Sequence, residues 1–169
     1  MKEEAFPIRR ETELNYIKLM EMVQPEDSLL LLMHGSPDPD AIASAMALRE
    51  IVQRTKGLSK SALVSTEPLV RQQNAELVHS LRLYIPLINQ VDVRSYRLIA
   101  LLDAQPSFFS NTLSLIKPQI VFDHHPYEGE WNAGLMDIRP NYGALSSILT
   151  EYLIRSRVKI PRNLHTALL

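Results

Sequence analysis

The sequence of 169 residues contains no cysteine, and its formal net charge is only −1. The absence of cysteine excludes disulfides, thiolate zinc sites and cysteine nucleophiles. The balanced charge provides no global basic field, so any contact with nucleic acid or an anionic membrane must be local. The first residues lack the apolar core of a signal peptide, and no apolar run approaches the roughly 20 residues that span a bilayer. We therefore expect a cytoplasmic protein that does not bind membranes.

Hydrophobic residues make up 46% of the chain, enough for one domain with a substantial core. Short apolar runs predict strands of a sheet that is buried on both faces, over residues 29–33, 60–65, 97–103, 119–123 and 135–138. Helices are predicted between and around them, over residues 11–23, 41–56, 71–83 and 144–155. The alternation predicts an α/β fold: a doubly wound, largely parallel five-stranded sheet with helices on both faces.

Polar side chains follow three of these apolar runs. His34 ends the first run and Asp38 and Asp40 lie in the loop behind it, Asp103 ends the run 97–103, and Asp123-His124-His125 ends the third. Ligands of open parallel sheets bind outside the carboxyl ends of the strands. Imidazole and carboxylate ligands together suit manganese or magnesium. An alternative is structural: Asp40 caps the helix that begins at Ala41, and Asp38 and His34 are solvated loop residues. Three such strand ends favour the metal site, since gathered charges are costly to bury without a cation.

Residues farther along the chain are candidates for contacts with a substrate. Arg139 precedes a glycine-led helix start and could reach a phosphate, although pairing with a nearby carboxylate is the alternative. Backbone N–H groups near Gly143 could hold an anion, although helix capping explains the same residues. Asp137, in a short predicted strand, could substitute as a metal ligand, although we assign it to a turn or to the surface.

The spacing of these motifs resembles that of the DHH phosphoesterase superfamily. The first motif is matched by His34-x-x-x-Asp38-x-Asp40-Ala41, the second by Asp103, the third by Asp123-His124-His125, and a following helix start by Gly143-Ala144-Leu145. The superfamily includes RecJ-type exonucleases, nanoRNases that are also phosphoadenosine-phosphate phosphatases, cyclic-dinucleotide phosphodiesterases, exopolyphosphatases and the related manganese pyrophosphatases. The resemblance assigns residues 1–26 to a lead-in with a peripheral helix and residues 27–169 to a DHH-type domain.

The resemblance implies a site with two divalent cations, manganese first and magnesium as the alternative. His34, Asp38 and Asp103 would hold one cation. Asp40, Asp103 and His124 would hold the second, with Asp103 bridging the two. Asp123 would orient His124. The implied catalytic residues are Asp103, Asp123 and His125, and the implied substrate contacts come from His125, Arg139 and Gly143.

We therefore predict a metal-dependent hydrolase that cleaves phosphodiester or phosphomonoester bonds with a metal-activated water. Its substrate would be a phosphorylated small molecule or a short single-stranded oligonucleotide. The alternatives are a manganese-dependent pyrophosphatase or exopolyphosphatase, a non-catalytic nucleotide-binding module, and a receiver-like domain, which would not need three histidines. Family members carry a further aspartate and a second domain downstream of the point where this sequence ends. We expect a fragment that lacks its C-terminal substrate-binding domain and need not be active alone; the alternative is a truncated chain with a weakened second metal site. A homodimer is a further expectation.

Overall fold

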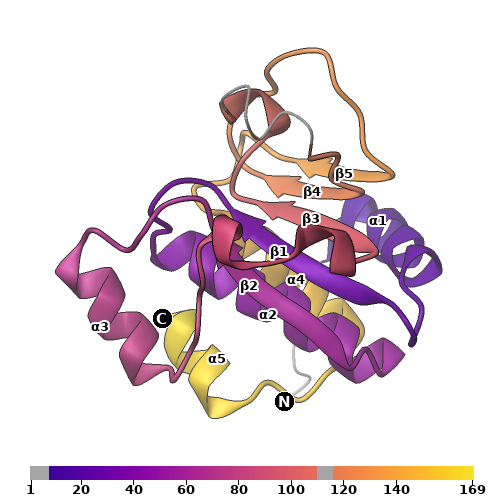
Figure 1. Ribbon diagram of the computed structural model, residues 1–169. Coiled ribbons are helices and arrows are strands. Elements are labelled where there is room, and N and C mark those ends of the chain that lie inside the picture. The colour runs from indigo at the N-terminus through magenta and orange to yellow at the C-terminus, as the bar shows by residue number, and fades with distance from the viewer. Residues whose placement is uncertain (1–7, 110–115) are drawn as a thin grey trace.

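A computed structural model describes residues 8–109 and 116–169 (Figure 1). Five strands form one sheet in the order β2-β1-β3-β4-β5, and every neighbouring pair is parallel. The strands are β1 (Ser28–Met33), β2 (Lys60–Ser65), β3 (Leu98–Leu102), β4 (Ile120–Asp123) and β5 (Leu135–Ile138). The predicted α/β fold with a parallel five-stranded sheet is confirmed.

The α-helices are α1 (Arg10–Met22), α2 (Pro39–Lys56), α3 (Gln72–Ser80), α4 (Leu145–Ser156) and α5 (Arg162–Ala167). In the described part of the chain, three 3₁₀ helices lie in the connections: η1 (Ile88–Gln90), η2 (Val93–Ser95) and η3 (Pro106–Phe108). Helix α3 ends three residues before the predicted boundary at residue 83, because Arg82 takes a left-handed backbone conformation with φ 54°. Among the described residues, no helix has both the length and the apolar character needed to cross a membrane.

The two faces of the sheet are covered differently. Leu29, Leu31 and Met33 of β1 pack into the larger core together with residues of the α-helices. Leu30 and Leu32 point to the opposite face, as the two-residue repeat of a strand requires. That face is covered by residues of the 3₁₀ helices and loops, such as Phe108 and Trp131. Figure 1 shows α2 and α4 behind the sheet.

The strand order creates a crevice between β1 and β3. The chain runs from β1 to β2 on one side and reaches β3 on the other, so the connections that follow β1 and β3 lead in opposite directions. Helix α2 begins at this point, and its buried alanines, Ala41, Ala43, Ala45 and Ala47, let it pack closely on the sheet and on α4. The ends of β1, β3 and β4 therefore meet the starts of α2 and α4 at one edge of the sheet.

Candidate metal centre

The first motif spans the loop from β1 into α2. Asp38 is the N-cap of α2: its Oδ1 accepts a hydrogen bond from the Ala41 backbone N–H at 2.9 Å, and Pro39 occupies the first helical position. The structural alternative for Asp40, a cap on its own helix, is therefore wrong, since Asp38 fills that role.

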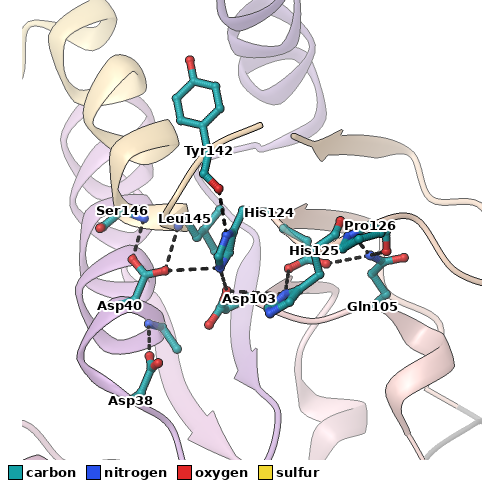
Figure 2. A network of polar contacts seen from close by, with 12 residues as sticks. Asp38, Asp40, Asp103, Gln105, His124, His125, Pro126, Tyr142, Leu145 and Ser146 are labelled. Atoms are coloured by element: carbon teal, nitrogen blue, oxygen red, sulfur yellow. Dashed lines mark hydrogen bonds and ion pairs between the residues drawn. The ribbon is translucent and has the colours of Figure 1, made fainter. Parts of the chain in front are cut away.

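Asp40 instead caps a different helix. Its two carboxylate oxygens accept hydrogen bonds from the backbone N–H groups of Leu145 (2.7 Å) and Ser146 (2.8 Å), at the start of α4 (Figure 2). These N–H groups follow Gly143, and they are the groups that we predicted from the sequence to bind an anion. In this structure the carboxylate of Asp40 is that anion, which draws α2 and α4 together beside the strand ends.

Asp103 follows β3 in a left-handed conformation with φ 57°, which aspartate tolerates better than most residues. Its N–H donates to the Phe122 carbonyl (3.0 Å), tying the residue to β4. The carboxylate atom Oδ1 is buried and accepts no hydrogen bond from the described residues. Burial, with the nearby charges of Asp40 and Asp38, raises the pKa of Asp103 to about 6, although His124 and His125 act in the opposite direction.

His124 points one ring nitrogen at these carboxylates. Its Nδ1 lies 3.1 Å from the Tyr142 carbonyl oxygen, which can only accept, so the proton of the neutral ring is on Nδ1. The lone pair of Nε2 then faces Asp103 Oδ1 at 3.3 Å and Asp40 Oδ2 at 3.9 Å (Figure 2). A lone pair opposite carboxylate oxygens is favourable only with positive charge between them, so this arrangement fits a cation.

Asp123 is fully buried and serves the other histidine. Its Oδ1 accepts from His125 Nδ1 at 2.8 Å, and its Oδ2 accepts from the Gln105 side-chain amide at 2.7 Å. The prediction that Asp123 orients His124 is therefore wrong. Burial lowers the pKa of His125, but the hydrogen bond and charge of Asp123, with the charges of Asp103 and Asp38, outweigh it and leave the pKa above its ordinary value. The side chain of His125 is 43% exposed, so it can meet a substrate.

Ligand atoms of Asp103, His124 and His125 all lie within 4.8 Å of one another, so this cluster could bind a metal ion. Asp40 adjoins it through His124. His34 and Asp38 lie on a neighbouring cavity of about 330 Å³, which Asp103 shares. The exposed ring of His34 packs edge-on against Phe109, with ring centres 5.0 Å apart. The predicted metal ligands thus lie at one edge of the sheet in two groups. Asp103 belongs to both groups, with His34 and Asp38 in one and with Asp40 and His124 in the other.

The structure places Arg139 elsewhere. Its side chain is buried and makes two hydrogen bonds to the Asp137 carboxylate, at 2.6 and 2.7 Å. The prediction that Arg139 binds substrate is therefore not supported, and its alternative, pairing with a carboxylate, is what the structure contains. The surface assignment of Asp137 is wrong as well, since this residue is fully buried. Gly143 is exposed, with open space around it, so its proposed substrate contact stays a prediction.

Sequence reasoning missed two residues at this edge. Gln105 is fully buried and holds Asp123 in place. Arg71, at the start of α3, lines the same cavity as His34, Asp38 and Asp103. The segment that carries Arg71 is attached to the first motif by two hydrogen bonds, from Val70 N–H to Ser36 Oγ (3.0 Å) and from Asn74 Nδ2 to the Pro37 carbonyl (3.0 Å). No local sequence pattern identifies Arg71 as a site residue, because the candidate ligands that line the same cavity, His34, Asp38 and Asp103, are more than 30 positions away in the sequence.

This chain is similar, over most of its length, to parts of two longer proteins. It is 36% identical over 140 residues to the uncharacterized protein MJ1633 of Methanocaldococcus jannaschii, a match that covers 83% of this chain and 28% of that protein. The crystal structure of an exopolyphosphatase-related protein from Bacteroides fragilis matches with a TM-score of 0.60 at 15% identity, over 85% of this chain and 44% of that one. This chain and the Bacteroides fragilis protein share a fold. The chain spans less than half the length of either protein, and no protein-family model matches it.

Proposed function

We propose that residues 27–169 form a DHH-type phosphoesterase domain, preceded by a lead-in and peripheral helix over residues 1–26. The observation that carries this proposal is the buried Oδ1 of Asp103, which has no hydrogen-bond donor among the described residues and faces the lone pair of His124. While His124 is neutral, a purely structural role leaves that oxygen without a partner, at a cost of about 1–3 kcal/mol. A divalent cation removes the cost and accounts for the gathered acids.

The donor set fits hard or borderline cations, with manganese first and magnesium as the alternative. His34, Asp38 and Asp103 would hold one cation, and Asp40, Asp103 and His124 the other. When bound, such cations polarise a phosphoryl group and lower the pKa of an attacking water. Asp103 is the residue common to both groups, since it shares a cavity with His34 and Asp38 and lies 3.3 Å from His124.

His125 is proposed to meet the substrate phosphate. Asp123 fixes its ring by accepting from Nδ1, and Gln105 in turn fixes Asp123. In the metal-free protein, burial lowers the pKa of His125, but the hydrogen bond and charge of Asp123 hold it above its ordinary value. A protonated ring can donate to a phosphate oxygen or give its proton to the leaving oxygen. Arg71, which lines the cavity that His34, Asp38 and Asp103 share, is proposed to bind a further phosphate charge of the substrate.

The proposed reaction is hydrolysis of a phosphodiester or phosphomonoester in a phosphorylated small molecule or a short single-stranded oligonucleotide. The second candidate is hydrolysis of polyphosphate, in line with the name of the exopolyphosphatase-related protein from Bacteroides fragilis, or of pyrophosphate. Substrate contacts from a further C-terminal domain in the same protein, a cytoplasmic location and a homodimer belong to the proposal as well.

The test is calorimetric titration with manganese, followed by hydrolysis assays of a model phosphodiester, pyrophosphate and polyphosphate. Both use this chain and, where the natural protein is longer, the whole protein. We expect manganese-dependent release of product from one substrate class, and its loss in Asp103→Asn. The control is Asp92→Asn, which changes an exposed aspartate of the η2 loop. Specific binding without hydrolysis would identify a non-catalytic module, and the absence of both would refute the metal centre.

A further inference from the structure

A polar network, buried except for Tyr142, lies between β5, α1 and α4. It comprises Thr12, Asp137, Arg139, Tyr142, Glu151 and Tyr152, and we call it the Arg139 network. Besides its paired bonds to Asp137, Arg139 donates from Nη1 to Glu151 at 3.2 Å and from Nη2 to Thr12 Oγ1 at 2.8 Å. Burial opposes these charges, yet hydrogen bonding holds the pKa of Arg139 above its ordinary value and the pKa of Glu151 below it. The network is therefore charged.

A charged network in a core is rarely needed for stability alone, since well-packed apolar residues often serve as well or better. Its effect is to hold particular groups in one arrangement. The groups at its outer end belong to the turn Arg139-Pro140-Asn141-Tyr142, which joins β5 to α4. The Tyr142 N–H donates to the Arg139 carbonyl at 3.0 Å, and proline occupies the second position, which suits a β-turn.

Glu151 holds this turn at both ends. It accepts from the Arg139 guanidinium at the first residue of the turn and from the Tyr142 hydroxyl at the last. The guanidinium groups of Arg9 and Arg139 also contact the Tyr142 ring, at 4.7 and 5.5 Å from its centre. The Arg139 N–H donates to the Asp123 carbonyl at 3.0 Å, so the turn is also tied to the end of β4.

The carbonyl of this same Tyr142 accepts from His124 Nδ1. We propose that Glu151 and the Tyr142 hydroxyl are positioning residues for the metal centre. By fixing the turn, they aim the Tyr142 carbonyl at Nδ1, which fixes the proton of His124 there and leaves Nε2 to face Asp103 and Asp40. The inference rests on the proposed metal centre for its purpose, but the link from Glu151 to the His124 ring is a property of the metal-free protein. Arg139 thus acts on the metal centre indirectly: it helps to hold the turn in place and does not contact a substrate.

The test compares two tyrosines of the network. Tyr142→Phe removes the hydroxyl that holds the turn. Tyr152→Phe is the matched control, because it also removes a hydroxyl that donates to a buried carboxylate of the network, Asp137 (2.5 Å), but it leaves Glu151 and Tyr142 bound to each other. Thermal melts establish that each variant folds. Nitrogen-15 NMR of the histidine rings reports the His124 tautomer without metal, and calorimetry reports manganese affinity.

For Tyr142→Phe we expect a mixture of His124 tautomers and a loss of manganese affinity of roughly 10–100-fold, the usual effect of removing an outer partner of a metal ligand. For Tyr152→Phe we expect a lower melting temperature with the wild-type tautomer and affinity. Glu151→Gln, which removes the charge at the centre of the network, should shift the tautomer as Tyr142→Phe does.

A wild-type tautomer in Tyr142→Phe would overturn the inference, as would an equal change in Tyr152→Phe. If the wild-type protein binds no manganese, the proposed function fails, while the tautomer comparison still decides whether the network positions His124.

Discussion

Replacing Asp103 with asparagine should make the metal-free protein more stable at neutral pH. Burial near Asp40 and Asp38 raises the pKa of Asp103 to about 6, against an ordinary value of 3.8. A raised carboxyl pKa means that ionisation favours the unfolded chain, so the penalty grows as pH rises from about 4 and is complete above about 6. The difference of about two pH units corresponds to about 3 kcal/mol, an upper limit for the gain in Asp103→Asn. Asparagine also accepts the left-handed backbone at this position, whereas alanine would add strain.

The assay is urea unfolding with a chelator at pH 4, 6 and 7.5, repeated with manganese at pH 7.5. We expect the free energy of unfolding of the variant to exceed that of the wild type at pH 7.5 and to equal it at pH 4. For a domain of this size, each kcal/mol shifts the melting temperature by about 2–4 °C, so thermal melts should show the same order. Manganese should stabilise the wild type and leave the variant unchanged, with Asp92→Asn behaving like the wild type throughout. A wild type that is at least as stable as the variant in chelator at pH 7.5 would refute the electrostatic reasoning.

Three further changes test other parts of the site. His125→Gln should lower hydrolysis more than manganese affinity; the exposed His79, changed to glutamine, is the control for both measurements. Arg71→Gln should raise KM several-fold with little change in kcat, measured on the cleaved substrate, and an unchanged KM would remove Arg71 from the substrate site. Arg139→Met should lower the free energy of unfolding by about 3–5 kcal/mol, since it leaves Asp137 and Glu151 buried without their cation; a near-neutral result in urea unfolding would show that the network is not charged.

The sequence by itself determined the sheet and the edge that carries the site. Apolar runs such as 29–33 and 120–122 are too short for core helices and too continuous for half-buried strands, so they predict buried parallel strands. Parallel strands end at a common edge, and this brings Asp103 and His124 together from residues that are 21 positions apart. The chemical character of the candidate site follows from that topology, because a strand end is a local feature that sequence pattern reveals.

The partners of each polar side chain were decided only by the tertiary structure. Asp40 bonds to the start of α4, more than 100 residues away, and not to its own helix. Asp123 lies next to His124 in sequence, yet it bonds to His125. Successive side chains of an extended chain point to opposite sides, so residues 123 and 125 lie on the same side. Arg139 is buried because α1 and α4 close over β5 with Thr12 and Glu151 at matching positions. Hydrogen-bond partners depend on which elements pack together and on what burial leaves unsatisfied, and no local sequence pattern contains that information.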